Sequence, residues 1–243
     1  MKIYQNPEEH NVGDTLSVPI FEHLFPNKTI EMVSEETEGK IVAVGSIMTK
    51  VRPGDIVFGT GVIRETDMIN NAENAEFLAV RGKLSRDIVI RSGGKCPEVY
   101  GDPAILLSKI YCPKIEKTHS LGIIPHYVDR KNEEVDKIHQ ATSSKIIDVA
   151  LPWKEFVNEI LSCEKVISSS LHGIIIAEAY GVPAEWVVFS NRVIGNGFKF
   201  RDYLTGTGRD IIGPGEFPRI SEIEKIQIGL IQALESKFGK CII

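Results

Sequence analysis

The chain has 243 residues, of which 42% are hydrophobic and 25% charged, and its formal net charge is −5. This composition is typical of a soluble globular protein, and the length suits one large domain or two domains of about 100–120 residues each. The acidic balance and the lack of a basic run exclude a nucleic-acid-binding surface and a polybasic membrane anchor, so we expect no nucleic-acid partner.

The cysteines and the N-terminal stretch indicate the compartment. No CxxC pair and no His/Cys cluster with zinc spacing occurs around Cys96, Cys112, Cys163 and Cys241. We therefore expect free thiols in a reducing compartment and no metal site. The N-terminus turns polar too early for a signal peptide, and no apolar run approaches the roughly 20 residues that span a bilayer. These features predict a cytoplasmic protein.

Short strand-like runs alternate with helix-like runs, which predicts an α/β fold with mostly parallel sheets. In the first half, we expect strands over residues 2–5, 40–45, 55–58 and 77–80. Helices are expected to begin at the turn Asn11-Val12-Gly13-Asp14, near Lys83, and at the turn Gly101-Asp102-Pro103-Ala104.

The second half shows the same alternation more clearly. Strands are expected over 120–125, 145–149, 166–168 and 185–189, with helices over 132–143, 153–163 and 172–180 between them. The order β-α-β-α-β-α-β predicts a small doubly wound unit. Ser221-Glu222-Ile223-Glu224 matches a capping box, which predicts that a long amphipathic helix begins there and runs to Phe238.

A polar connector at residues 113–119 marks the expected boundary between two domains. We expect an N-terminal Rossmann-like domain on the acceptor side over 1–115, a C-terminal Rossmann-like domain on the donor side over 116–213, and a C-terminal helix segment over 214–243. The two open sheets should face each other across a cleft, because ligands in such sheets bind at the carboxyl ends of the strands.

The stretch VISSSLHGIIIAEAYGVPAEW places Ser168, Ser169, Ser170 and His172 between a buried strand and a buried helix. A helix N-terminus offers free N–H groups and a positive dipole end, so this turn predicts an anion site. The hydroxyls would add donors, Gly173 would admit a ligand close to the backbone, and His172 would supply a charge or a proton. Alternatively, one serine caps the helix and His172 is a core histidine.

Other polar residues follow predicted strands in the same way. The turn 11–14 ends in Asp14, Arg81 could bind a carboxylate or phosphate, and His126 follows the strand at 120–125. The alternatives are an Asp N-cap, a surface arginine and a structural histidine. For Glu178, inside an apolar helix, we expect a buried structural partner. Neither GxGxxG, GxxxxGK[ST], GxSxG nor HExxH occurs.

Eight segments in the right order resemble the polysaccharide pyruvyl transferase family. They are NVGD, AVGS, GTGV, AVRG, YGDPAILL, LGIIPHYVD, IIDV and VISSSLHGIIIAEAYGVPAEW, which together span about residues 10–205. The resemblance implies a fold like that of the two-Rossmann GT-B glycosyltransferases, with the C-terminal helix packing back on the first domain. It also implies transfer of pyruvate from phosphoenolpyruvate to two hydroxyls of a sugar, which forms a cyclic ketal and releases phosphate.

The resemblance and the chemistry together suggest roles. Some relatives carry an arginine at the position of Ser170. In this chain the phosphate or carboxylate of the donor would instead be bound by Arg81, by Lys199 or by the turn itself. His172 is the first choice for proton transfer, with Asp14 and His126 handling the acceptor hydroxyls. Further acceptor-side residues are expected at Asn11, Gly13 and Asp102.

No metal is expected, because the sequence shows no metal-ligand cluster, and no cofactor is expected, because phosphoenolpyruvate acts as a co-substrate. The acceptor expected is a lipid-linked oligosaccharide, which would bring the protein to the inner face of the membrane. Two alternatives remain: a GT-B glycosyltransferase that uses a nucleotide sugar, and a non-catalytic module that binds an anionic sugar.

Overall fold

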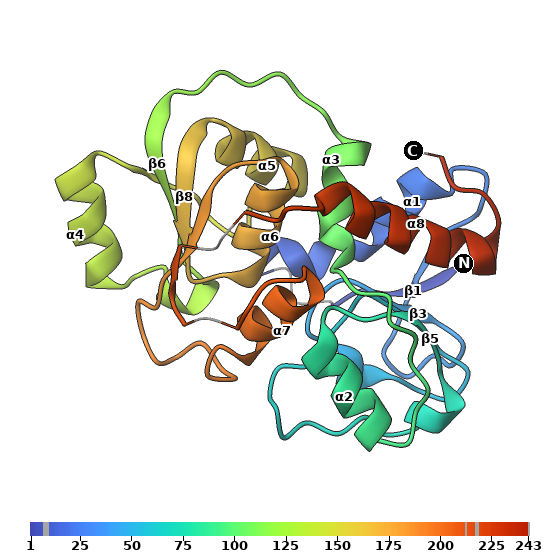
Figure 1. Cartoon of the computed structure of the whole chain (residues 1–243). Helices are drawn as coiled ribbons and strands as arrows, with labels where there is room; N and C mark the ends of the chain where they lie inside the picture. Colours follow the sequence, from blue (N-terminus) through green and yellow to red (C-terminus); the bar gives the residue numbers. More distant parts are fainter. Residues whose placement is uncertain (7–9, 212, 217–218, 243) are drawn as a thin grey trace.

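The structure is a computed structural model that describes residues 1–6, 10–211, 213–216 and 219–242. Two five-stranded sheets form within these residues, one in each half of the chain (Figure 1). The first sheet has the order β2-β1-β3-β4-β5 and is parallel throughout. Its strands are β1 Lys2–Tyr4, β2 Glu31–Val33, β3 Ile41–Val42, β4 Ile56–Phe58 and β5 Glu76–Ala79.

The second sheet has the order β10-β9-β8-β6-β7, and every pairing is parallel except that of β10 with β9. Its strands are β6 His119–Ile124, β7 Lys145–Ile146, β8 Cys163–Ser168, β9 Ala184–Trp186 and β10 Gly215–Glu216. The succession β6-α4-β7-α5-β8-α6-β9 confirms the predicted doubly wound unit.

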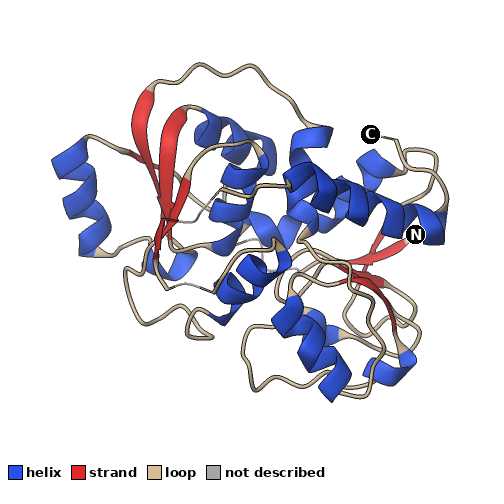
Figure 2. Ribbon diagram, viewed as in Figure 1, coloured by secondary structure: helices blue, strands red, loops and turns tan. Residues whose placement is uncertain are grey.

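Helices flank both sheets (Figure 2). They are α1 Ser17–Leu24, α2 Lys83–Arg91, α3 Leu107–Ile110, α4 Glu133–Thr142, α5 Trp153–Leu161, α6 Leu171–Ala179, α7 Phe198–Gly206 and α8 Ile223–Phe238. Short 3₁₀ turns connect them: η1 Val12–Thr15, η2 Met48–Lys50, η3 Ala72–Asn74, η4 Pro103–Leu106 and η5 Tyr127–Asp129. No helix in the described part of the chain is both long and apolar enough to cross a bilayer.

The last helix, α8, returns to the first half of the chain, as expected. Its Gln227 side chain donates to the Ile105 carbonyl over 2.8 Å, and Phe238 packs edge-on against Phe25. In Figure 1, α8 lies beside α1 and α3, at the opposite side of the molecule from α4.

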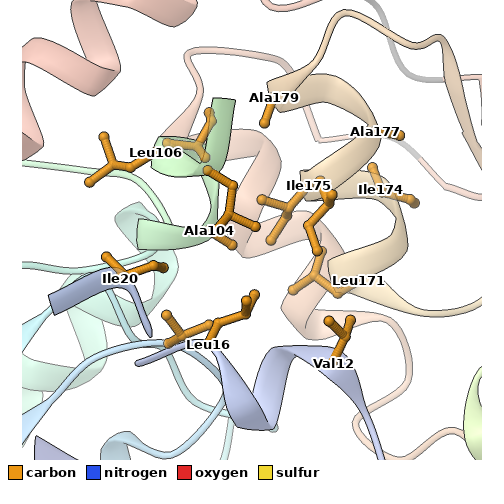
Figure 3. Close-up of a cluster of buried hydrophobic side chains, with 14 of the residues drawn as sticks. Val12, Leu16, Ile20, Ala104, Leu106, Leu171, Ile174, Ile175, Ala177 and Ala179 are labelled. Atoms are coloured by element: carbon orange, nitrogen blue, oxygen red, sulfur yellow. The ribbon is translucent and has the colours of Figure 1, made fainter. Parts of the chain in front are cut away.

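One hydrophobic core runs through both halves. Figure 3 shows Leu16, the residue before α1, and Leu106 of η4 beside Leu171 and Ile175 of α6, and all four are buried. Every residue of α6 except Glu178 is buried, which confirms the expectation from its continuous apolar sequence. The two sheets are therefore joined by an apolar seam, with α6 at its centre.

Several predicted boundaries need correction. The predicted capping box at 221–224 is wrong, because α8 begins at Ile223, its N-cap is Glu222, and no side chain caps it. The strands predicted at 40–45, 145–149 and 185–189 are shorter than expected, because their hydrophobic runs continue past the paired residues into loops, which are buried after β3 and partly exposed after β9. Strands β2 and β10 and helix α7 were not predicted, because their residues carry no clear periodic pattern.

Candidate functional site

A cavity of about 160 Å³ opens between the two halves of the chain. Its walls include Asn11, Asp14 and Ser46 from the first half, and His126, His172 and Lys199 from the second. The segments that follow β1, β6 and β8 bring Asn11 and Asp14, His126, and His172 here, as expected for the carboxyl ends of parallel strands. The cavity thus gathers five of the predicted site residues.

The turn after β1 is fixed by its own side chain and by the second half. The Asn11 side-chain carbonyl accepts from the Gly13 amide over 3.1 Å and caps η1. The Val12 amide donates to the carbonyl of Val149 over 2.6 Å. Asp14 therefore reaches the cavity from a turn that is anchored on both sides.

His172 lies in the first turn of α6, and only 5% of the residue is exposed. Its ring packs directly on the backbone of Gly13, where an added Cβ would stand 1.8 Å from Nδ1. Its Nε2 lies 3.6 Å from Oδ2 of Asp102. The first half of the chain therefore sets the position of a histidine that belongs to the second half.

Asp102 does not line the cavity, although it was predicted on the acceptor side. It is fully buried, and its Oδ1 accepts from the Ala104 amide at the start of η4 over 3.0 Å. Its Oδ2 and the Nε2 of His172 are both buried and have no hydrogen-bond partner among the described residues. Two complementary polar atoms that face each other at 3.6 Å would gain a hydrogen bond from a small approach of either side chain.

Lys199 is half-buried at the cavity wall, near the start of α7. Burial and, to a lesser extent, the nearby charge of Arg81 lower the pKa of its ammonium group to about 8, although the charge of Asp14 acts in the opposite direction. Below that pH, Lys199 carries a positive charge that is poorly hydrated and therefore suited to binding an anion.

His126 is held as a neutral ring. Burial lowers its pKa to about 3, and the nearby Lys199 and His172 contribute in the same direction. Its Nδ1 accepts weakly from the Val128 amide over 3.4 Å, and its ring lies 4.3 Å from that of Tyr127. A neutral imidazole can hydrogen-bond to a ligand in the cavity but is a weak base.

The three serines of the turn are less available than the sequence suggested. Ser168 donates to the Ile124 carbonyl and accepts from the Ser170 amide, each over 2.9 Å. Ser169 donates to Asp129 and accepts from the His126 amide. The Ser170 hydroxyl is buried and has no partner among the described residues. None of the three lines the cavity, and the hydroxyls of Ser168 and Ser169 are used for hydrogen bonds within the fold.

Gly173 and Arg81 also lie outside the cavity. A Cβ on Gly173 would stand 2.5 Å from Oγ of Ser168, so this glycine permits close packing of α6 on its strand. Arg81 is fully buried, and its Nε donates to Asp202 over 2.9 Å. Its Nη1 donates over 2.7 Å to the hydroxyl of Ser46, which does line the cavity. Arg81 thus reaches the site by its hydrogen bond to Ser46 and by the effect of its charge on Lys199.

Ser46 is a site residue that the sequence analysis did not select, although it ends the AVGS segment of the family resemblance. Glu178 has the structural role expected of it, with an ion pair to Arg209 at 2.5 Å and a hydrogen bond from Tyr203 at 2.7 Å. Within the described residues, no three His, Cys, Asp or Glu side chains are grouped as a metal site requires.

One family model and two curated relatives match the chain. The model of the polysaccharide pyruvyl transferase family matches residues 11–190. An uncharacterised protein of Acanthamoeba polyphaga mimivirus is 30% identical over 208 residues, which cover 82% of this chain and 71% of that protein. The succinoglycan biosynthesis protein ExoV of Rhizobium meliloti is 27% identical over 219 residues, which cover 86% of this chain and 65% of ExoV.

No solved structure matches the chain. The family model spans the turn of Asn11, the His126 segment and the turn of His172, so it includes all but one of the predicted residues that line the cavity, Lys199 being the exception. The chain therefore belongs to the polysaccharide pyruvyl transferase family.

Proposed function

We propose that the protein transfers the pyruvyl unit of phosphoenolpyruvate to two hydroxyls of a sugar in a polysaccharide precursor, with release of phosphate. One observation carries the proposal: a proton-transferring group, a cation and a carboxylate (His172, Lys199 and Asp14) line one cavity in a chain of this family. Cation, acid and base are the groups that this transfer needs.

The size and charge of the cavity favour a small anionic donor. Its volume of about 160 Å³ lies below the roughly 300–1,000 Å³ typical of sites for drug-sized ligands. That volume suits phosphoenolpyruvate better than a nucleotide sugar. Lys199, charged below about pH 8, would bind the phosphate or the carboxylate of the donor.

The proposed reaction has two stages. Protonation of the methylene carbon of phosphoenolpyruvate breaks the C=C double bond and leaves an oxocarbenium-like centre at C2. One sugar hydroxyl adds to C2 and loses its proton. The C2–O bond to phosphate then breaks as the second hydroxyl adds, and its proton leaves with the phosphate. The products are a cyclic ketal and inorganic phosphate, so atoms and charge balance.

We assign the roles from the contacts. His172 donates the proton to the methylene carbon, since it lines the cavity, and its ring packs against Gly13 and faces Asp102. Asp14 receives the proton of an acceptor hydroxyl. His126 is neutral and orients the acceptor by hydrogen bonding rather than by proton transfer. Arg81 supports the donor site through Ser46.

The proposal extends to the architecture and the acceptor. We regard residues 1–115 and 116–213 as two Rossmann-like domains in a GT-B-like arrangement, with 214–243 returning to the first. The two sheets on either side of the cavity and the contacts of α8 support this division. The acceptor we propose is a lipid-linked oligosaccharide, which would bring the protein to the inner face of the membrane.

Ligand-dependent melting tests the donor. A ligand at about 100 times its Kd stabilises a protein by roughly 2.7 kcal/mol. For a chain of this size, that is a rise in Tm of roughly 5–10 °C. Phosphoenolpyruvate should give such a rise, while UDP- and GDP-sugars should give none.

Phosphate release in the presence of phosphoenolpyruvate and lipid-linked oligosaccharides then tests the transfer itself. Stabilisation by a nucleotide sugar, with none by phosphoenolpyruvate, would contradict the proposal and favour a glycosyltransferase. Binding of phosphoenolpyruvate without phosphate release from any acceptor would instead favour a non-catalytic module.

A further inference from the structure

A second cavity, of about 370 Å³, adjoins the first in the C-terminal half. It lies at the carboxyl ends of β8 and β9, where Ser169 and Trp186 contribute to its wall. Ile194 lines both cavities, so the two are neighbours that share one side chain. A ligand in the second cavity would therefore lie next to a donor bound beside His172.

The wall of this cavity combines an aromatic floor with uncharged polar groups. Trp186 and Phe200 stack with their rings 4.4 Å apart and only 7° from parallel, which makes a rigid base. Asn191 and Asn196 stand at the rim and are exposed. An Asn amide both donates and accepts, as the hydroxyls of a sugar do.

The charges of the wall argue against a nucleotide or another strongly anionic ligand. Arg201 is the sole charged side chain among the described residues that line it, and its Nη1 already donates to the Asn196 carbonyl over 2.8 Å. The first turn of α7 is also occupied, because the Phe198 and Phe200 amides donate to the carbonyls of Gly195 and Gly197. A phosphate would find few free donors here, whereas a neutral polyhydroxylated ring would find amides and an apolar base.

We propose that this second cavity is the subsite for a neutral sugar unit of the acceptor. This inference rests on the proposed function, because it assigns the acceptor to a place beside the proposed donor cavity. It puts the acceptor sugar on the C-terminal half, with Ile194 between the sugar and the donor. Its volume lies at the small end of the roughly 300–1,000 Å³ range for ligand sites, so the subsite holds a short piece of the acceptor.

The chain has two tryptophans, Trp153 and Trp186, so replacing the first isolates a reporter in the cavity floor. In the Trp153→Phe protein, Trp186 fluorescence is titrated with the methyl β-glycosides of glucose, galactose and mannose. At least one glycoside should give a saturable change. Saturation-transfer NMR on the unaltered chain gives the same answer should Trp153→Phe disturb α5.

Asn196→Gly provides the decisive variant. Asn196 has a positive φ of 45°, so glycine keeps its backbone conformation while removing the amide. Loss of the hydrogen bond should weaken glycoside binding by roughly 3- to 10-fold. Asn71→Gly is the matched control, because Asn71 also has a positive φ of 62° and does not line the cavity. It should leave binding unchanged.

Three outcomes would overturn the subsite: no glycoside binds, all bind Asn196→Gly as tightly as the parent, or UDP alone changes the Trp186 signal. Stabilisation by phosphoenolpyruvate, measured by melting on the same proteins, separates the two proposals. If phosphoenolpyruvate stabilises the protein and no glycoside binds, the subsite fails and the donor stands. If glycosides bind and phosphoenolpyruvate does not stabilise, the proposed donor fails and the subsite stands.

Discussion

Replacing Gly13 by alanine tests whether the backbone of the first half positions His172. The new Cβ would stand 1.8, 2.1 and 2.4 Å from Nδ1, Cε1 and Cγ of the ring. Ordinary carbon contacts begin near 3.4 Å, so the ring or the η1 backbone must move by about 1.6 Å (3.4 minus 1.8). The ring is buried except where it lines the cavity, so a displacement would push it out of position and into the proposed donor site.

The expected losses of stability and of rate follow from the overpacked side chain and from the misplaced ring. Extra volume in a packed site costs about 1–3 kcal/mol of stability, which corresponds to a fall in Tm of roughly 2–12 °C for a chain of this size. A catalytic group misplaced by about 1 Å costs on the order of 10²-fold in rate. We therefore expect Gly13→Ala to fold, to melt lower and to lose at least about 10²-fold in kcat.

A double-mutant cycle with His172→Ala identifies the cause. Once the ring is gone, the alanine at position 13 has no clash, so its cost in Tm should largely disappear in the double variant. Gly229→Ala on α8 is the control, because nothing lies within 4 Å of a Cβ there. Its turnover should be normal and its stability slightly higher. Near-normal turnover of Gly13→Ala, or an equal loss of Tm in both backgrounds, would refute the argument.

Three further predictions concern other residues of the site. The Lys199 ammonium deprotonates as the pH rises through about 8, so kcat/KM for phosphoenolpyruvate should fall about tenfold per pH unit above that value. Lys199→Arg should move this fall to higher pH, and a flat wild-type profile up to about pH 10 would contradict the prediction. Asp102→Asn keeps an oxygen that caps η4 but places an amide donor opposite His172. We therefore expect kcat to fall by about 10- to 100-fold with an unchanged KM for phosphoenolpyruvate. A normal kcat would show that Asp102 does not position the ring. Arg81→Ala leaves the buried Asp202 unpaired, which should cost about 3–5 kcal/mol and be visible as a large fall in Tm; a change of less than about 1 °C would refute a structural role.

The local sequence pattern was enough to predict the strand, turn and buried helix around His172. A continuous apolar run that stops at Gly181 and Pro183 has few other solutions, and parallel strands bring such turns to one edge. The meeting of this turn with Asp14 and His126 followed from the same rule. Lys199 was predicted as a donor-binding cation, although the helix α7 on which it lies was not predicted.

What each side chain binds could not be predicted from local patterns. Arg81 looked like an anion ligand because it follows a strand, but its partner Asp202 lies 121 residues away on an unpredicted helix. Ser168 and Ser169 looked like donors to a ligand, and both are used by neighbouring strands and turns. The pairing of Asp102 with His172 likewise depends on how η4 packs against α6, which no local pattern encodes.

The apolar seam through α6 also bears on how the molecule unfolds. Proteins built from two sheets commonly lose them in separate steps when few apolar contacts join the units. Here the same buried cluster contains Leu16 and Leu106 from the first half and Leu171 and Ile175 from the second (Figure 3). If one half unfolded alone, the apolar face of α6 that packs against it would become exposed to water, which would destabilise the other half as well. Heating should therefore give one calorimetric transition, and neither half should be stable as an isolated fragment.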